Sequence, residues 1–230
     1  MAGEAGFLYE GKIHRKLKAA GLVPNGYTPA GSDANAPDAM FIYNKANQKL
    51  ELKLDLKADY GQGTLEYDQK KRIWTLGGAK TAAAEEMRQL LRAVGVEQFA
   101  NKNWGPKGPP NKGTIPNKSI TQDMVKSDYA RFKDAFLPIK PAALWNYYAA
   151  KQNYYIQIGG YGMYYMQQNP AQLPIPQFSP SMRVRIRVKR GGSVLYNYRF
   201  TTALQIVQKP AKSKYDLDRD VNFLKAIYTE

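Results

Sequence analysis

A short alternating run, LELKLDLK (50–57), contains side chains that could hold a cation and activate a water molecule. In a β-strand successive side chains point to opposite faces, so the leucines would line one face and the charged residues the other. Glu51 and Lys53 would then be neighbours, and Asp38 precedes them on the chain. Two carboxylates on adjacent strands could hold Mg²⁺, which prefers oxygen ligands, and the lysine could act on a water beside it.

The scarcity of other reactive side chains narrows the chemistry. There are no cysteines, and His14 is the only histidine. Disulfides, thiolate zinc sites, cysteine nucleophiles and multi-histidine metal sites are therefore excluded, and a Ser-His-Asp triad would have to be built on His14. Any hydrolysis must depend on carboxylates, lysines, tyrosines and hard cations.

The overall charge indicates the kind of partner. The chain has 34 basic and 19 acidic residues, a formal net charge of +15. A protein of this charge is attracted to polyanions, so nucleic acid is the first candidate partner and an anionic membrane surface the second. The N-terminal sequence is not typical of a secretory signal, and no run of about 18 apolar residues predicts a membrane span. We therefore expect a cytoplasmic protein whose partner is nucleic acid and not a membrane.

The spacing of apolar residues predicts the elements that position these side chains. Residues 5–20 have apolar side chains at three- and four-residue intervals, which predicts a helix with Glu10 near its beginning. Residues 40–43 and the alternating run predict an antiparallel hairpin. An apolar stripe predicts a helix over 80–99, and the Pro/Gly/Asn/Lys composition of residues 101–118 predicts a flexible loop.

The last third of the chain is rich in strand-forming residues and tyrosines. The tyrosines of residues 154–166 could stack on bases, although such a run more often packs in a core and at interfaces. Residues 183–200 predict a hairpin that turns at Gly191-Gly192. One face of its first strand carries basic residues that would either contact the phosphates of a polyanion or be solvated: Arg183, Arg185, Arg187 and Lys189.

Three of these features together resemble the PD-(D/E)XK nuclease superfamily. They are Pro37-Asp38 at the start of the hairpin, Glu51-Leu52-Lys53 on its second strand, and Glu10 on the preceding helix. The resemblance covers about the first quarter of the chain. It implies a DNA endonuclease that hydrolyses phosphodiester bonds by attack of a metal-activated water, with Mg²⁺ as cofactor and Mn²⁺ as its substitute.

The proposed roles follow the matched positions. Asp38 and Glu51 would be ligands of the cation, and the resemblance adds the backbone carbonyl of Leu52. Lys53 would lie about 6–7 Å along the strand from Glu51, where its ammonium could orient the attacking water and stabilise the developing charge. Glu10 would meet the cation through water or help to hold a second ion.

Two further residues receive accessory roles. Gln62 is similar to a glutamine that many members of the superfamily carry after the lysine, although it could equally be an ordinary turn residue. Lys57 continues the charged face and would contact nucleic acid or be solvated.

The predicted fold class is α/β. The hairpin over 38–57 would form part of a restriction-endonuclease-like mixed β-sheet, flanked by the helices 5–20 and 80–99, with a strand- and tyrosine-rich C-terminal extension. A homodimer is implied if both DNA strands are cut, because one such centre cuts one strand. No nucleotide cofactor is expected, and an origin in a phage or mobile element fits this type of protein.

A single domain is predicted over 1–230. Its catalytic core would cover about 1–100, and its C-terminal substrate-binding region about 119–230.

Other interpretations remain open at this stage. The alternating run could be an ordinary half-exposed strand whose polar face is solvated. The chain could then be a non-catalytic nucleic-acid-binding protein on a nuclease-like scaffold, or an architectural basic protein. If it is a nuclease, its substrate could be RNA instead of DNA.

Overall fold

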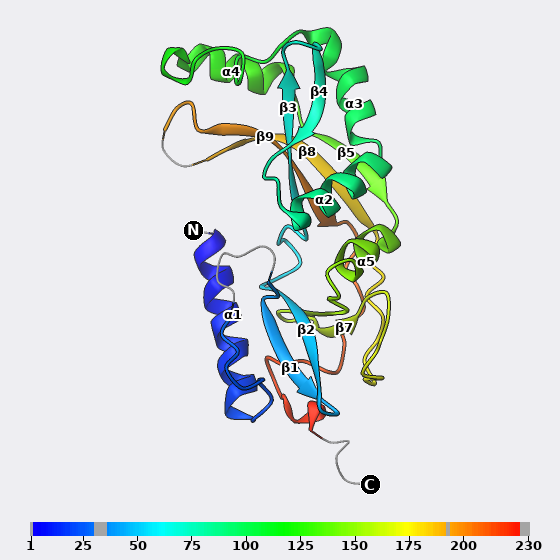
Figure 1. Cartoon of the computed structure of the whole chain (residues 1–230). Coiled ribbons are helices and arrows are strands. Elements are labelled where there is room, and N and C mark those ends of the chain that lie inside the picture. Colours follow the sequence, from blue (N-terminus) through cyan, green and yellow to red (C-terminus); the bar gives the residue numbers. More distant parts are fainter. Residues whose placement is uncertain (1, 30–35, 192–193, 226–230) are drawn as a thin grey trace. The chain divides into compact units, whose positions relative to one another are not determined.

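The computed structural model describes residues 2–29, 36–191 and 194–225, and Figure 1 shows the course of the chain. The chain divides into two compact units, and each is built around a β-sheet of its own with helices beside it. The predicted α/β class is therefore confirmed. The first unit comprises Met1–Ala58, Lys140–Ser181 and Ile206–Glu230, and the second comprises Asp59–Ile139 and Met182–Gln205. Among the described residues, no helix is long and apolar enough to cross a membrane.

The sheet of the first unit has four strands in the order β1-β2-β6-β7. Strand β2 pairs antiparallel with β1 and parallel with β6, and β6 pairs antiparallel with β7, so the sheet is mixed as predicted. The strands are β1 (Ala39–Tyr43), β2 (Ala46–Lys53), β6 (Tyr155–Ile158) and β7 (Gly162–Tyr165). Residues of the tyrosine-rich segment thus form two strands of this sheet. The sequence analysis had placed them in a C-terminal extension.

The β1–β2 hairpin is closed by two residues with left-handed backbone conformations. Asn44 and Lys45 have φ angles of 48° and 61°, which are typical of the tight turn whose twist matches that of the flanking strands. The second strand is shorter than predicted, because β2 ends at Lys53 and Leu54 is exposed. The side chain of Asp55 accepts a hydrogen bond from the Lys57 backbone N–H and stabilises a turn at this point.

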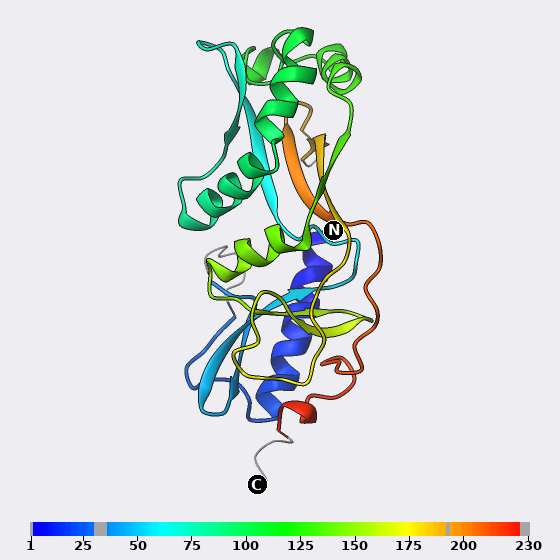
Figure 2. The ribbon, with the colours of Figure 1, turned by 90° about the vertical axis from the view of Figure 1, so that its right-hand side faces the viewer.

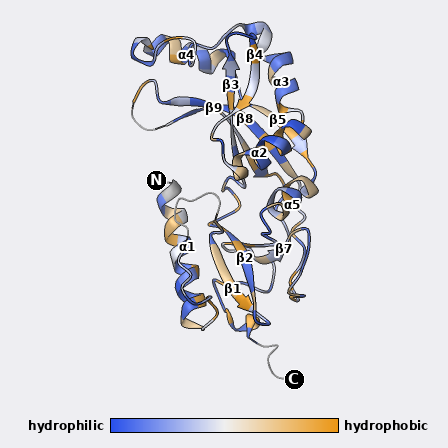
Figure 3. Ribbon diagram, in the orientation of Figure 1, coloured by the Kyte–Doolittle hydropathy of each residue, from blue (hydrophilic) through white to orange (hydrophobic). Residues whose placement is uncertain are grey.

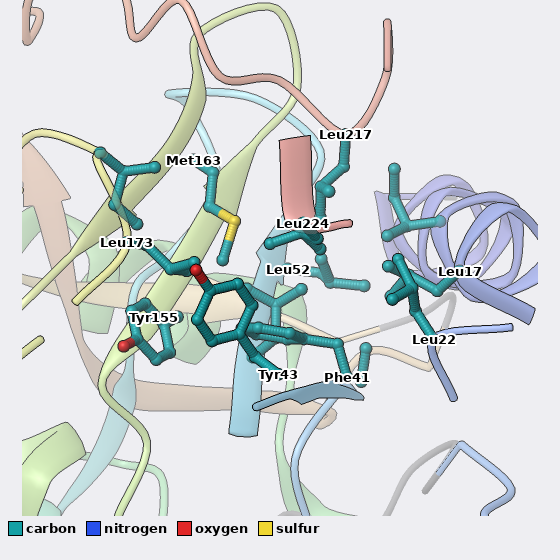
Figure 4. Close-up of a cluster of buried hydrophobic side chains, with 14 of the residues drawn as sticks. Leu17, Leu22, Phe41, Tyr43, Leu52, Tyr155, Met163, Leu173, Leu217 and Leu224 are labelled. Atoms are coloured by element: carbon teal, nitrogen blue, oxygen red, sulfur yellow. The ribbon is translucent and has the colours of Figure 1, made fainter. Parts of the chain in front are cut away.

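Helix α1 (Ala2–Ala19) packs against β1 and β2 and buries one side of the sheet. Ile13, Leu17, Leu50 and Phe41 are fully buried in this core. Figure 4 shows Leu17 and Leu52 with side chains contributed from distant parts of the chain, such as those of residues 173, 217 and 224. Figure 3 shows that β1 is mainly hydrophobic, whereas α1 carries both hydrophobic and hydrophilic residues. The alternating residues of β2 therefore give this strand one buried face and one polar face.

Parallel pairing brings helix α5 (Pro141–Ala149) and strand β6 to the first unit. The two chain segments approach closely where both strands end, and the Gly159 N–H donates to the Lys53 carbonyl at 2.9 Å. A Cβ atom at position 159 would lie 2.1 Å from the Leu54 carbonyl oxygen, so this position requires glycine. A 3₁₀ turn, η3 (Asn222–Leu224), supplies the buried Leu224 near the end of the described chain.

The second unit contains a five-stranded sheet in the order β4-β3-β9-β8-β5. The turn of the 182–206 hairpin was predicted at Gly191-Gly192, and Gly192 lies outside the described residues. The strands are β3 (Gln62–Asp68), β4 (Ile73–Gly77), β5 (Ala135–Ile139), β8 (Met182–Arg190) and β9 (Tyr198–Ile206).

The predicted helix over 80–99 is two helices, α2 (Ala82–Ala93) and α3 (Val96–Asn103). Gly95 separates them with a φ of +86°, a left-handed conformation that ends a helix. Helix α2 packs on β3 and β4 of the second sheet and α3 packs on β4, so the expectation that this segment flanks the sheet of the 38–57 hairpin is wrong. Figure 2 shows these two helices beside the strands of the second unit's sheet.

Aromatic side chains fill the core of the second unit. The ring of Trp74 lies edge-to-face against Trp104, Phe132 and Phe200, with centroids 4.8–5.2 Å apart. These residues come from β4, the end of α3, the end of α4 (Gln122–Arg131) and β9. The cluster therefore holds together segments that are far apart in the sequence.

The segment 101–118 is not the structureless loop that its composition suggested. It contains the end of α3 and the 3₁₀ turn η1 (Gly105–Lys107), and it leads into η2 (Asn117–Ser119). The fully buried carboxylate of Asp128 accepts hydrogen bonds from the backbone N–H groups of Asn111 and Lys112, each at 3.0 Å. Tyr198 donates a further bond to Asp128 at 2.6 Å. A buried carboxylate with several donors therefore anchors this segment.

Candidate active site

Glu51 and Lys53 form an ion pair on the polar face of β2. The Lys53 Nζ lies 2.5 Å from Glu51 Oε1, and each side chain is less than one-fifth exposed. Burial acts to lower the pKa of Lys53, but the carboxylates of Glu51 and Asp38 outweigh it and raise the pKa above its ordinary value. Lys53 is therefore held as an ammonium ion beside a carboxylate.

Asp38 lies directly before β1, opposite this pair, because Ala39 pairs with Leu50. Its Oδ2 accepts a hydrogen bond from the Leu52 backbone N–H at 2.8 Å. Burial and the neighbouring Glu51 carboxylate raise the pKa of Asp38 to about 7, although the Lys53 ammonium and the Leu52 hydrogen bond oppose this shift. The site thus holds two mutually repelling carboxylates and one ammonium group.

The Leu52 backbone is oriented toward Asp38. Along β2, the Lys53 carbonyl bonds to Gly159 on the β6 side, whereas the Leu52 N–H bonds to Asp38 on the β1 side. In an extended strand the N–H and C=O of one residue point the same way, so the Leu52 carbonyl is directed to the Asp38 side. Its position is compatible with the ligand role that the sequence suggested.

Glu10 on α1 is electrostatically coupled to the same group of residues. Burial raises the pKa of Glu10, the Lys53 ammonium lowers it, and the Glu51 carboxylate raises it. Glu10 is also among the charges that raise the pKa of Asp38 and of the Tyr27 hydroxyl, the latter to about 12. The structure therefore brings Asp38, Glu51 and Lys53 together, and the charge of Glu10 acts on this group from α1.

Two residues at this site escaped the sequence analysis. The hydroxyl of Tyr148, on α5, donates to Glu51 Oε1 at 2.9 Å, and the side-chain amide of Asn153 lies 3.3 Å from Glu51 Oε2. They are 97 and 102 positions from Glu51 in the sequence. Only the parallel pairing of β2 with β6 brings them near, and no local pattern indicates that pairing.

Oxygen donors dominate this arrangement, and the donor set fits a hard divalent cation. Burial and the repulsion between two carboxylates raise the pKa of Asp38, and a cation between the carboxylates would relieve that repulsion. Mg²⁺ keeps several waters and needs only one or two carboxylates. Within residues 2–29, 36–191 and 194–225, however, no three or more His, Cys, Asp or Glu side chains form a group that could hold a metal ion. Any cation would therefore also use other oxygen atoms or water.

Two predicted accessory residues lie elsewhere. Lys57 is exposed in the turn after β2. Gln62 belongs to the second unit, where its side chain donates to Asp59 Oδ2 at 3.0 Å.

The basic residues of β8 also belong to the second unit, and three of them have side-chain partners. Arg185 pairs with Asp134 at 2.5 Å, and Arg187 lies 3.6 Å from Asp59. The Arg183 guanidinium is stacked 4.0 Å above the Phe136 ring. The alternate residues of this strand are buried, as expected. Because acids neutralise two of the arginines, this face attracts phosphates less strongly than four unpaired cations would.

Comparisons with known proteins add one structural likeness. No model of a known protein family matches the chain, and no curated protein matches it. A solved HhaI endonuclease in complex with DNA is similar in structure over 94% of this chain and 97% of its own, with a TM-score of 0.47 and 12% sequence identity.

Proposed function

We propose that the chain is a DNA endonuclease that hydrolyses phosphodiester bonds with a divalent cation, Mg²⁺ or Mn²⁺. The observation that supports it best is the Glu51–Lys53 ion pair at 2.5 Å beside the half-buried carboxyl of Asp38. Partial burial of two carboxylates and a lysine costs stability, and ionisable groups with strongly shifted pKa values cluster at functional sites. The site contains the groups that metal-assisted hydrolysis requires, and it needs no histidine.

Each residue of the site has a proposed task. Asp38, Glu51 and the Leu52 carbonyl would hold the cation, which supplies charge neutralisation and a more acidic water when it is bound. Lys53, held as an ammonium ion, would donate a hydrogen bond to the attacking oxygen or to the phosphate and stabilise the charge that develops there. Glu10 would accept hydrogen bonds from water at the edge of the site.

Substrate binding is proposed for basic residues outside the site. They are Lys57, Arg183, Arg185, Arg187 and Lys189. They would contact the DNA backbone, and a homodimer would allow both strands to be cut.

Cleavage assays with single substitutions test this proposal. Supercoiled, linear, branched and single-stranded DNA, with RNA in parallel, would be incubated with the protein and Mg²⁺ or Mn²⁺, and with EDTA as control. We expect cleavage of DNA that EDTA abolishes. Glu51→Gln and Lys53→Met should each reduce it at least about 100-fold. Binding of the same DNA, measured in Ca²⁺, should persist. Undiminished cleavage by Lys53→Met would contradict the proposed role of that residue.

A non-catalytic nucleic-acid-binding protein is the second candidate. The lack of a three-carboxylate group among the described residues favours it, as does the net charge of +15. This candidate predicts DNA binding without cleavage of any substrate, and binding that is indifferent to Glu51→Gln. Preferential digestion of RNA would instead show that the chain is a ribonuclease.

A further inference from the structure

The side chain of Asn153 is almost completely buried, with 3% of its surface exposed, and it faces Glu51. With its nitrogen toward Glu51 Oε2, the amide makes a single long hydrogen bond of 3.3 Å to the carboxylate. Its oxygen then faces the backbone carbonyls of Lys49 and Tyr155, which are themselves acceptors. This orientation leaves a buried amide oxygen opposite two groups that cannot donate to it.

If the Asn153 amide is rotated by half a turn, its nitrogen gains two hydrogen-bond acceptors. The nitrogen then donates to the carbonyl of Lys49 at 3.1 Å and to that of Tyr155 at 3.2 Å. The oxygen takes the former place of the nitrogen, 3.3 Å from Glu51 Oε2. Two hydrogen bonds replace one, and the amide oxygen then faces the Glu51 carboxylate oxygen. Such a pair is stable only if a cation or a proton lies between the two atoms.

The contacts of Glu51 indicate which of its oxygens is available for a cation. Lys53 Nζ and the Tyr148 hydroxyl both bond to Oε1, at 2.5 and 2.9 Å. Oε2 is the oxygen that faces Asn153. The two sides of the carboxylate are therefore different: donors hold one oxygen, and the other lies beside a buried amide.

We infer that the side-chain oxygen of Asn153 is a ligand of the divalent cation, which it binds together with Glu51 Oε2; this inference rests on the proposed function. Adjacent oxygen ligands of Mg²⁺ at 2.0–2.1 Å are about 2.9–3.0 Å apart, and somewhat further apart around larger cations. The place that the oxygen would take from the nitrogen, 3.3 Å from Glu51 Oε2, is slightly wider than the Mg²⁺ spacing and suits a larger cation such as Mn²⁺. A neutral amide oxygen adds a ligand without adding a third repelling carboxylate.

Metal binding in the absence of DNA tests the inference. Mn²⁺ would be titrated into the intact protein and free Mn²⁺ followed by electron paramagnetic resonance. Variants would be Asn153→Leu, which has a similar volume and no oxygen, and Asn153→Asp, which keeps an oxygen. We expect Asn153→Leu to weaken binding about 10-fold or more and Asn153→Asp to match or exceed the wild type. Asn146→Asp makes the same charge change at an exposed position of α5 and should leave affinity unchanged.

Crystals soaked in Mn²⁺ give a direct and independent readout. An anomalous peak within about 2.5 Å of both Asn153 Oδ1 and Glu51 Oε2 would support the inference. A peak at Glu51 that lies further than about 3.5 Å from Asn153 would overturn it and leave the proposed function intact. The same holds if Asn153→Leu binds Mn²⁺ as tightly as the wild type while remaining folded by circular dichroism. If the wild type itself binds no Mn²⁺, the proposed function fails together with the inference.

Discussion

At the scale of single residues, Asp38 makes the stability of the metal-free protein depend on pH. Its pKa is raised to about 7 in the folded chain by burial and by Glu51, against about 3.9 in an unfolded chain. Between these values the folded state binds the additional proton, so the stability gained from protonation is complete below about pH 4 and is lost as the pH rises through about 7. The contribution of Asp38 should therefore make the metal-free protein more stable near pH 5 than near pH 8.

The substitution Asp38→Asn tests this dependence. It removes the titrating group, so the free energy of unfolding near pH 8 should rise by at least about 1 kcal/mol, since one pKa unit corresponds to about 1.4 kcal/mol. The difference from the wild type should shrink toward pH 4. Urea denaturation in EDTA at several pH values measures it. A loss of stability in Asp38→Asn at pH 8 would show that the carboxylate is not destabilising. Added Mn²⁺ should stabilise the wild type at pH 8 and leave Asp38→Asn unchanged.

Tyr148 should matter for activity more than its distance in sequence suggests. Its hydroxyl donates to Glu51 Oε1, so Tyr148→Phe should release the carboxylate on that side and lower the rate of DNA cleavage about 10-fold. The loss of a hydrogen bond to a charged group should also cost about 1–3 kcal/mol of stability. Tyr164→Phe is a matched control, because its hydroxyl donates to the Ala211 carbonyl in the same unit. Equal rates for Tyr148→Phe and Tyr164→Phe at equal stability would contradict the positioning role.

At the scale of elements, the sequence predicted what local periodicity determines. The alternation of β2 and the apolar stripe of α1 are encoded within a few residues, and they identified the hairpin and the helix. The end of β2 was misjudged because Leu54 and Leu56 continue the alternation, although the chain turns after Lys53. Alternation alone does not show where a strand loses its partner.

Pairing between distant segments could not be predicted in this way. Strand β6 lies about 100 positions after β2, and its parallel pairing places Tyr148 and Asn153 at the site. Several pairings satisfy the same hydrophobic pattern, and only the packing of the complete sheet selects one of them. The four residues assigned to catalysis lie within the first 53 positions, where local pattern and the resemblance could select them, and their catalytic roles stay predictions.

A substitution at Gly159 tests the parallel pairing of β2 with β6. A methyl group there would lie 2.1 Å from the Leu54 carbonyl, so Gly159→Ala should push β6 away from β2 and destabilise the chain by about 1–3 kcal/mol. Gly6→Ala is the matched control, because nothing lies within 4 Å of its added carbon and alanine favours the helix by up to about 1 kcal/mol. Denaturant unfolding of both variants measures the contrast. An unchanged midpoint for Gly159→Ala would mean that the two strands do not approach so closely.

At the scale of the whole molecule, a net charge of +15 predicts binding of DNA that weakens steeply with salt. The charges of β8 do not all contribute to this attraction, because Asp134 and Asp59 lie beside two of its arginines. A paired guanidinium keeps its hydrogen-bond donors in a fixed orientation but presents less net charge to a phosphate. The affinity for DNA should therefore be below that expected from a count of basic residues.

Removal of one of these acids should strengthen binding. Asp134→Asn leaves Arg185 without its carboxylate partner, so affinity for random-sequence duplex DNA in Ca²⁺ should rise about threefold to tenfold near 0.1 M salt. If Arg185 then engages a phosphate, the slope of log affinity against log salt should steepen by about one. Asp123→Asn makes the same charge change at a side chain that is 92% exposed on α4 and should give a smaller increase. Fluorescence anisotropy at several salt concentrations measures both quantities. Equal increases for the two variants would mean that only the total charge matters, and that Arg185 does not contact DNA.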